Sequence, residues 1–256
     1  MTPAGAAPRG CVITGTDTDA GKTVVTAALL RALLEYGLES DPENRFEARA
    51  IKPVQTGCEP GEDGNPAAPD VKRCIEALRG LSLPEAAQPR ASALRCFHPA
   101  CSPHLAARKA GEHLDARELA LACRTEACKA NFTLIEGAGG VHVPLNDEED
   151  MLDLMAALDF PVLLVVGNKL GCINHALLTL DALAARGLRG TGMILCRTRP
   201  DRPEETCLLA DNAAVLARKG AERGFPLLAD LPFLPGLDAP SCGERESAWA
   251  RLSALL

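Results

Sequence analysis

Lys22 and Thr23 stand side by side at the start of an expected helix, directly after a short polar loop. The loop begins at Gly15 and follows a run of apolar residues, so the local order is strand, loop, helix. That order aims backbone N–H groups and a helix N-terminus at one point and makes a cradle for phosphate oxygens. In such a cradle the lysine contacts the β- and γ-phosphates, and the threonine hydroxyl binds Mg²⁺. The pattern predicts a nucleotide site rather than a structural turn.

The loop departs by one residue from the usual GxxxxGK[ST] spacing. Gly15 lies one position further from the lysine, and Thr16 takes the place of the first glycine. A chance Gly-Lys-Thr triplet is common, but one that joins a buried strand to a helix is not, so the prediction stands. The residues expected to bind the nucleotide here are Gly15, Thr16, Asp17, Thr18, Asp19, Ala20, Gly21, Lys22 and Thr23.

Two further expected strands end in a charged side chain. Lys52 closes the second strand, where it is a candidate to neutralise a carboxylate or a transferring phosphoryl group; the alternative is a lysine whose head reaches water. Glu136 precedes a glycine-rich turn at residues 137–140, as an acid presented to magnesium does; the alternative is a structural carboxylate at a strand end. The glycines let backbone amides approach a ligand closely.

A fourth segment, residues 165–175, leads from a buried strand into the N-terminus of another expected helix. Free amides at a helix start suit a carboxylate. We interpret His175, in the first turn of that helix, as structural. Asp70 follows a proline in a loop before a helix, and by composition alone it is an N-cap.

Short β-branched runs alternate with amphipathic stretches along the whole chain. The expected strands cover residues 11–15, 48–53, 132–136, 162–167, 191–196 and 226–229. The expected helices cover residues 23–36, 71–79, 116–129, 174–185 and 206–218. Nearly continuous apolar strands are buried on both faces, which predicts an α/β fold of the P-loop NTPase-like kind, a doubly wound, mostly parallel β-sheet with helices on both faces. Ligands of such sheets collect at the carboxyl ends of the strands.

The length fits one domain over residues 1–256, with residues 1–9 as a flexible tail. Surface loops are expected at residues 39–45 and 59–69. The proline-containing region 83–103 is expected to be a longer excursion from the sheet and a candidate substrate lid.

Composition narrows the class of partner and the compartment. The net charge of −7 and the pI near 5.3 speak against nucleic acid as a partner, because phosphate backbones bind basic faces. The longest apolar run is far too short to cross a bilayer, so no membrane association is expected. The 11 cysteines are scattered through apolar segments without a CxxC pair, which predicts reduced, mostly buried thiols in a cytoplasmic protein.

The four segments together resemble the dethiobiotin synthetases, the ATP-dependent enzymes of biotin biosynthesis. That family is marked by G-T-D-T-x-x-G-K-T, K-P-V-x-[ST]-G, E-G-A-G-G and K-L-G-x-I-N-H, and all four occur here in that order between Gly15 and His175. Residues 97–104 resemble another family segment, and the resemblance spans about two thirds of the chain. The extra residue of the phosphate loop is a feature of this family.

The resemblance implies a substrate and a reaction. One amine of 7,8-diaminononanoate combines with CO₂ to give a carbamate, whose oxygen attacks the γ-phosphate of ATP and gives a carbamic-phosphoric anhydride. The second amine then closes the ureido ring and expels phosphate. The resemblance implies Mg²⁺ as cofactor, ATP as co-substrate and a homodimer whose interface completes the substrate site. Such chemistry depends mainly on positioning and on charge stabilisation.

The family's roles carry over to matching residues of this sequence. Lys22, Lys52 and Thr18 are the implied catalytic residues. Thr23, Asp70 and Glu136 are the implied magnesium ligands, directly or through water. The implied substrate-binding residues are Thr56, Gly139, Gly140, Leu170, Gly171, Cys172 and Asn174, of which the last four meet the far carboxylate of the substrate across the dimer interface.

The sequence also departs from the family at several positions. Asp19 stands where a glutamate is common, and the loops before Lys52 and before Phe97 are longer than usual. Cys196, followed by Arg197, stands where an asparagine often reads the adenine; together with Pro232 it is expected to line the nucleotide site. Because a thiol is a poor substitute for an amide, the choice of nucleotide stays open at this stage.

Two other classes share parts of this pattern. An ATP-dependent amidotransferase of the cobyrinate or cobyrate type also carries a glutaminase domain, and too little chain follows Ala229 to build one. A partitioning ATPase of the MinD or ParA kind carries a second lysine early in its phosphate loop, where this chain has Thr18 or a neighbour. Residues 244–256 are helical in pattern but too short and too mixed in charge for a membrane anchor.

Overall fold

The computed structural model describes residues 9–41, 46–61, 66–84 and 89–256. Its main sheet has seven strands in the order β5-β2-β6-β1-β7-β8-β9, and every neighbouring pair is parallel. These strands are β1 (Gly10–Gly15), β2 (Ala48–Thr56), β5 (Ala91–Phe97), β6 (Phe132–Gly140), β7 (Val162–Gly167), β8 (Gly190–Cys196) and β9 (Leu227–Leu231). A two-stranded antiparallel pair, β3 (Glu59–Pro60) and β4 (Pro66–Ala67), lies outside this sheet.

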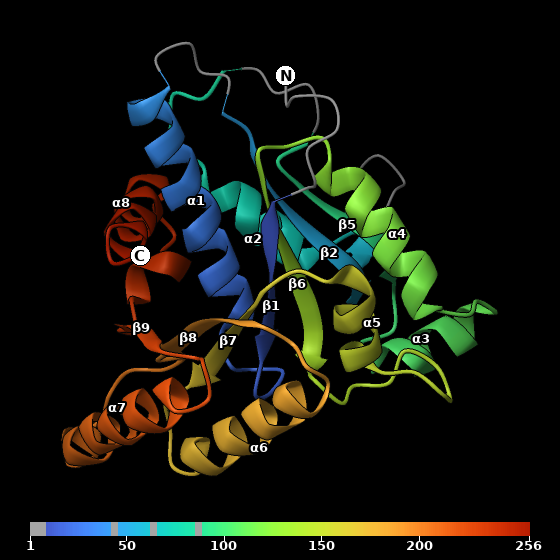
Figure 1. Cartoon of the computed structure of the whole chain (residues 1–256). Helices are drawn as coiled ribbons and strands as arrows, with labels where there is room; N and C mark the ends of the chain where they lie inside the picture. The colour runs from blue at the N-terminus through green and yellow to red at the C-terminus, as the bar shows by residue number, and fades with distance from the viewer. Residues whose placement is uncertain (1–8, 42–45, 62–65, 85–88) are drawn as a thin grey trace.

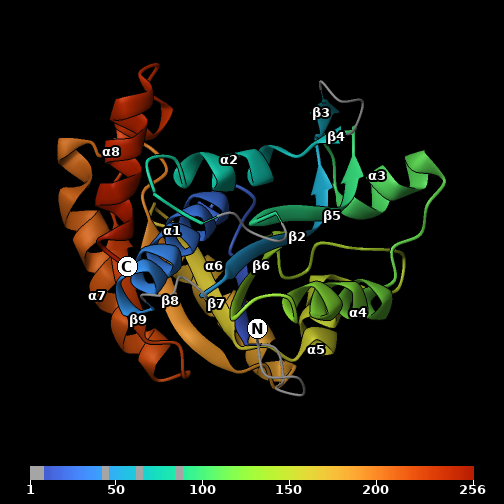
Figure 2. The ribbon, with the colours of Figure 1, turned by 90° about the horizontal axis from the view of Figure 1, so that it is seen from above.

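Helices cover both faces of the sheet (Figures 1 and 2). They are α1 (Lys22–Ser40), α2 (Pro69–Ala77), α3 (Pro103–Ala110), α4 (Ala116–Ala127), α5 (Met151–Leu158), α6 (Cys172–Ala185), α7 (Thr206–Ala221) and α8 (Cys242–Ser253), with short 3₁₀ turns η1 (Pro203–Glu205) and η2 (Pro235–Asp238). One core lies between the sheet and α1, α2 and α8, and the other lies under α3 to α7. Val12 belongs to the second core and its neighbour Ile13 to the first, because successive strand residues point to opposite faces.

The strand β1 lies at the centre of the sheet and determines where the site forms. It pairs with β6 on one side and β7 on the other, and Gly15 at its end is level with Gly140 and Val165. The strand β2 lies beyond β6, with Ile51 level with Ile135. Lys52 and Glu136 are therefore the next residues on two adjacent strands. The carboxyl ends of β1, β2, β6 and β7 meet at one edge, where doubly wound sheets bind ligands.

All six expected strands and all five expected helices are present, with small shifts at their ends. The excursion expected at residues 83–103 is wrong for Ala91–Phe97, which form the edge strand β5 and pair with β2. Their sequence gives little indication of a strand, because apolar and polar residues do not alternate regularly and prolines flank the segment. They form a strand because they pair with β2. Residues 85–88, also in that region, lie outside the described residues.

Three local predictions need correction. The N-cap of α2 is Ala68, so Asp70 lies inside the first turn of the helix rather than at its cap. The loop expected from residue 39 begins later, because α1 continues to Ser40; residues 42–45 are not described. The loop expected at 59–69 contains the short pair β3–β4 and the first residue of α2. Residues 1–8 of the expected tail are not described, whereas the carbonyl of Arg9 accepts a bond from Thr133 N at 2.9 Å.

The cysteines are relevant to the expected reduced thiols, and the helices to the expected lack of membrane association. All 11 cysteines are free, and Cys11, Cys58, Cys74, Cys123, Cys172 and Cys196 are buried. Within the described part of the chain, no helix combines the length and the apolar character needed to span a membrane.

Candidate active site

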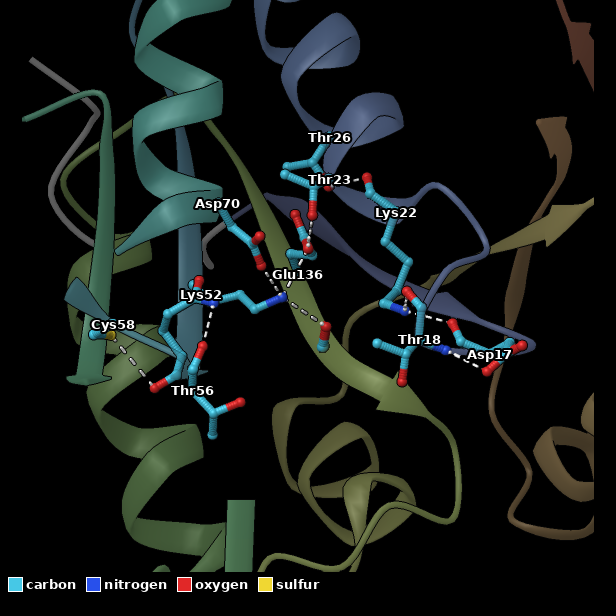
Figure 3. Close-up of polar contacts among 12 residues, drawn as sticks. Asp17, Thr18, Lys22, Thr23, Thr26, Lys52, Thr56, Cys58, Asp70 and Glu136 are labelled. Atoms are coloured by element: carbon cyan, nitrogen blue, oxygen red, sulfur yellow. Dashed lines mark hydrogen bonds and ion pairs between the residues drawn. The ribbon is translucent and has the colours of Figure 1, made fainter. Parts of the chain in front are cut away.

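The phosphate loop connects β1 to α1. Gly21 is the N-cap of α1 and has a φ of 97°, a left-handed conformation that favours glycine, and α1 then begins at Lys22. The Lys22 side chain folds back over the loop: a side chain at Gly15 would start about 3.0 Å from Lys22 Cγ. Lys22 Nζ donates to the carbonyl oxygens of Asp17 at 2.7 Å and Thr18 at 3.2 Å (Figure 3). The lysine thus contacts the carbonyls of its own loop.

The Lys22 ammonium is electrostatically strained in this position. Lys22 is only 4% exposed. Burial lowers the pKa of Lys22 to about 8, and repulsion by Lys52 contributes in the same direction, although Glu136 and Asp70 oppose it. A cation held in this state gains from an anionic ligand, because phosphate oxygens replace the hydration that burial has removed.

Lys52, Asp70, Glu136 and Thr23 form a second cluster, next to the loop (Figure 3). Lys52 comes from β2, Asp70 from α2, Glu136 from β6 and Thr23 from α1. Lys52 Nζ lies 2.6 Å from Asp70 Oδ2 and 2.7 Å from Glu136 Oε1, and it donates to the carbonyl of Gly137 at 3.2 Å. Thr23 Oγ1 donates to the same Glu136 Oε1 at 2.8 Å. Four elements far apart in sequence thus place four predicted site residues in mutual contact.

The charges of this cluster support one another despite their burial. Burial alone would lower the pKa of Lys52, but Glu136 and then Asp70 outweigh it, and the pKa is raised. Burial would raise the pKa of Asp70, but Lys52 outweighs it, and the pKa is lowered. The ammonium and the Asp70 carboxylate are therefore both held in their charged forms. Lys52 is 7% exposed and Glu136 only 2%, so this is a buried ion cluster whose partners depend on each other.

The donor set of this cluster fits magnesium. Asp70, Glu136 and Thr23 offer carboxylate and hydroxyl oxygens, the hard ligands that Mg²⁺ prefers, and Mg²⁺ sites commonly use only one or two carboxylates and keep several waters. No group of three or more His, Cys, Asp or Glu side chains that could hold a metal occurs among the described residues, so this smaller oxygen set is the candidate. The Lys52 ammonium, a cation bound between both carboxylates, shows that the place favours positive charge.

A cavity of about 410 Å³ opens beside the phosphate loop. Thr18, Asp19, Gly21, Lys22 and Thr23 line it from the loop and the first turn of α1, and Cys196 and Pro232 line it from the ends of β8 and β9. The two residues expected beside the nucleotide therefore face the same cavity as the loop. Its size and position suit the base and sugar of a nucleotide whose phosphates lie over the loop.

Cys196 takes part in this cavity mainly by packing. A Cβ added to Gly21 would lie 2.6 Å from Cys196 Sγ, so the thiol supports the phosphate loop directly. Burial raises the pKa of Cys196 to about 12, so the thiol is neutral. Arg197, which follows it, holds Asp201 at 2.7 Å and Asp230 at 2.9 Å.

Residues that the sequence did not single out complete the cavity. Arg73 of α2 lines it and holds Asp238 of η2 at 2.7 Å, and its guanidinium lies 5.3 Å from the centroid of Trp249 in α8. Arg73 follows Asp70 by three residues, so the two share a helix face, and this spacing was the available signal. Leu237 and Leu252 add an apolar wall from η2 and α8.

Of the expected substrate residues, Gly139 and Gly140 lie against the phosphate loop. Gly139 has a φ of 63°, and a Cβ there would lie 2.6 Å from Val143 Cγ2 and 3.6 Å from Thr18 Oγ1. Gly140 is level with Gly15. Thr56 ends β2, the strand that carries Lys52, and is half-buried. These three residues and the cluster around Lys52 line the same edge of the sheet.

The remaining expected substrate residues lie at the start of α6. Gly171 is the N-cap with a φ of 90°, and Asn174 is exposed in the first turn. Lys169, just before them, is 3.3 Å from Asp17 of the phosphate loop. The Cys172 side chain is buried, so only its backbone could meet a ligand, whereas Leu170 is 80% exposed. The structure thus brings this segment beside the loop and leaves the Leu170 side chain largely exposed.

Another cavity, of about 460 Å³, lies between α3 and the loop that follows β6. Its lining includes His104, His113, Asp147 and Glu149 and none of the predicted site residues. We assign it no role in the chemistry.

Comparison with known proteins identifies relatives of the chain. Residues 9–241 match the family described as "AAA domain". The curated ATP-dependent dethiobiotin synthetase of Pseudomonas paraeruginosa is 41% identical over 208 residues, which cover 81% of this chain and 83% of that protein. The ATP-dependent dethiobiotin synthetase of Janthinobacterium is 37% identical over 227 residues, 88% of each chain.

Solved structures establish the fold independently. A ParA family ATPase from Chlorobium tepidum superposes with a TM-score of 0.54 at 12% identity, covering 97% of this chain and 96% of that one. The cell division ATPase MinD of Pyrococcus furiosus gives a TM-score of 0.54 at 19% identity, covering 96% and 97%. At these identities the likeness shows a shared P-loop ATPase fold and nothing about function.

The sequence relatives, by contrast, show to which of the three families considered above the chain belongs. They favour neither the amidotransferases nor the partitioning ATPases, because identities of 37% to 42% over most of both chains all fall on one kind of enzyme. Their length also matches, since the alignments cover more than four fifths of each relative. The chain belongs to the ATP-dependent dethiobiotin synthetases, a family of ligases.

Proposed function

We propose that the protein closes the ureido ring of dethiobiotin from 7,8-diaminononanoate, CO₂ and ATP, with Mg²⁺ as cofactor. The observation that carries the proposal is the convergence at one sheet edge of Lys22, Lys52, Asp70 and Glu136, beside a cavity of nucleotide size. The names of the relatives support the overall reaction. The steps and the roles of single residues are part of the proposal.

The first step is attack on the nucleotide by a carbamate. One substrate amine adds to CO₂ and loses a proton, and the resulting carbamate oxygen forms a bond to the γ-phosphorus as the bond to ADP breaks. Lys22 stabilises the transferring phosphoryl group, and Thr18 donates a hydrogen bond beside it. Lys52 neutralises the carbamate and the phosphoryl oxygens. Thr23, Asp70 and Glu136 would hold magnesium, which would supply charge neutralisation at the phosphates.

The second step closes the ring. The other amine attacks the carbonyl carbon of the carbamic-phosphoric anhydride, the bond from that carbon to the phosphate oxygen breaks, and the amine loses its proton. Because Gly139 and Gly140 have no side chains, the diamine can approach the phosphate loop closely, and Thr56 orients the diamine from β2. Holding both reacting groups in place provides most of the acceleration that such a step needs.

The far carboxylate of the substrate would bind at the start of α6. Leu170, Gly171 and Asn174 are exposed next to the phosphate loop, and a helix N-terminus attracts a carboxylate. The exposed Leu170 supports a homodimer in which a second copy covers this segment and completes the site. The free state of all 11 cysteines supports a reducing, cytoplasmic location.

The test is product formation by the purified protein. Dethiobiotin detected by mass spectrometry, together with phosphate release that depends on both diaminononanoate and bicarbonate, is the expected outcome with MgATP. We expect Lys22→Ala and Lys52→Ala each to lower kcat/KM by about a hundredfold or more, because each removes a charge that stabilises the transition state.

The matched control is Lys72→Ala, which removes an exposed lysine from the same helix as Asp70 and should leave turnover unchanged. Phosphate release that ignores the diamine would overturn the proposal and leave an ATPase of another purpose.

A further inference from the structure

All three donors of the Lys52 ammonium have acceptors within reach in the structure. An ammonium has three N–H donors. In the structure Nζ has three acceptors within reach, namely Asp70 Oδ2 at 2.6 Å, Glu136 Oε1 at 2.7 Å and the Gly137 carbonyl at 3.2 Å. No donor is left for a phosphoryl or carbamate oxygen. The residue to which the proposed function gives a role at the reacting groups is therefore turned toward the residues that would hold magnesium (Figure 3).

The place that Lys52 occupies cannot also hold a metal ion. Lys52 Nζ lies within 2.7 Å of an oxygen of each carboxylate, which leaves no room between them for a second cation. Magnesium keeps several of its waters and needs room for them. Like charges a few ångströms apart in a buried site also repel strongly. The ammonium and a divalent cation are thus alternatives at these two carboxylates.

We propose that Lys52 is a built-in substitute for the divalent cation: its ammonium holds Asp70 and Glu136 together in the free enzyme, and magnesium arriving with the nucleotide displaces it toward the reacting groups. The proposal rests on the proposed function in one respect, that Thr23, Asp70 and Glu136 are the magnesium ligands. It explains why a catalytic lysine is buried among metal ligands. It also couples two events, since the metal cannot enter without releasing the lysine.

The proposed coupling between metal binding and release of Lys52 predicts the direction of changes in metal affinity and in stability. The free enzyme should bind a bare divalent cation weakly, because the cation must break three contacts of Lys52. Removing the lysine charge should leave two buried carboxylates without a partner, which destabilises the fold and creates affinity for the metal. Metal alone should then stabilise that variant and not the wild type, since a ligand that binds only the folded state raises its stability by mass action.

The experiment is a titration of nucleotide-free protein with Mn²⁺, followed by electron paramagnetic resonance. We expect Lys52→Met to bind Mn²⁺ about tenfold or more tightly than the wild type, in line with the loss of one nearby positive charge. The same variant should melt at a lower temperature than the wild type, and millimolar MgCl₂ without nucleotide should restore part of the difference.

The matched control is Lys22→Met. Lys22 is as buried as Lys52 and its charge acts on the same carboxylates, but it contacts neither of them within hydrogen-bonding distance. A gain in Mn²⁺ affinity that is confined to Lys52→Met supports displacement of the lysine from the metal ligands. An equal gain in both variants, or none in Lys52→Met, would overturn it, because then only the general field of the site matters. Asp70→Asn added to Lys52→Met should abolish the gain.

The wild-type chain provides a test that no folding defect can affect. Lysine side-chain ¹⁵N NMR should show a protected ammonium for Lys52 in the free protein, with Lys52→Gln identifying the signal. MgATP should remove this protection, and nucleotide with chelator should not. A signal that stays protected in the MgATP complex would contradict the displacement. Dethiobiotin formation plays no part in these measurements, so this inference and the proposed function can fail separately.

Discussion

At the scale of single residues, the two buried lysines differ in how their charge is balanced. Lys52 has two carboxylates in contact, and its pKa is raised. Lys22 has only backbone carbonyls in contact, and burial lowers its pKa to about 8. The first lysine is stable without a ligand, whereas the second is held in readiness for an anion. The difference follows from their places, since Lys52 lies within β2 beside Glu136 of β6, whereas Lys22 starts a helix behind its own loop.

The low pKa of Lys22 predicts proton uptake when nucleotide binds. At pH 9 the ammonium is mostly neutral in the free protein, because its pKa is about 8. Phosphate oxygens favour the charged form and raise that pKa, so binding takes up a proton at pH 9. At pH 6.5 the lysine is already charged, and binding should involve no uptake by this group. Calorimetry of nucleotide binding in buffers of different ionisation enthalpy measures the number of protons.

The proton count would argue against this assignment if it were the same at both pH values. Lys22→Arg provides the control, because a guanidinium stays charged at pH 9 and should remove the uptake while keeping the positive charge.

At the scale of elements, the junction between β1 and α1 depends on its neighbour β8. Gly21 has a left-handed φ of 97°. A Cβ added at this position would also lie only 2.6 Å from Cys196 Sγ. The loop is therefore held by the end of a strand that comes about 170 residues later in the sequence. The small thiol side chain lets the loop approach the sheet closely.

We expect Gly21→Ala to lower the free energy of unfolding by about 2–4 kcal/mol, the sum of left-handed strain and overpacking. Adding Cys196→Ala should return the overpacking part but leave the strain, so the two substitutions are not additive. Urea denaturation of the wild type, both single variants and the double variant gives the coupling energy. Strict additivity would show that the thiol and the loop do not touch in solution.

The sequence could predict these elements where one segment carries its own signal. Continuous apolar runs predicted β1, β6 and β7, and the Gly-Lys-Thr step predicted the start of α1. The strand β5 could not be found, because its pairing with β2 is a tertiary interaction that its own residues do not announce. For the site, motifs singled out Lys52, Glu136 and Thr23, and the family resemblance added Asp70; in the structure these four side chains lie in contact. What no motif could show is that Lys52 points at the carboxylates, since orientation depends on a neighbouring helix.

At the scale of the whole molecule, the candidate site lies partly at a surface that the monomer leaves open. Leu170 is 80% exposed beside Gly171 and Asn174, next to the phosphate loop. Leu178 on the same helix is also exposed, at 61%. Exposed apolar side chains next to a substrate site are typical of a surface that a partner covers, and we propose a second copy of the chain as that partner. We propose that each described chain acts as one domain and that two of them form the working enzyme.

Mixing two inactive variants tests whether the copies share a site. Lys22→Ala removes the phosphate lysine, and Asn174→Asp places a negative charge where the substrate carboxylate would bind. If each site combines the phosphate loop of one copy with the α6 start of the other, random exchange restores about a quarter of the sites. Dethiobiotin formation by the mixture, compared with each variant alone, measures the recovery. If the mixture forms no dethiobiotin although mass spectrometry confirms that the subunits have exchanged, the complete site lies within one chain.

The nucleotide cavity draws on both ends of the described chain, from Thr18 behind the first strand to Leu252 in the last helix. Arg73, Asp238 and Trp249 link these parts on the far wall. A chain emerging from the ribosome meets its residues in order, and domains tend to fold from the N-terminus during synthesis. Here the phosphate loop appears early but has no complete wall until α8 has left the exit tunnel. Nascent chains should therefore hold ATP only weakly until the last helix has docked.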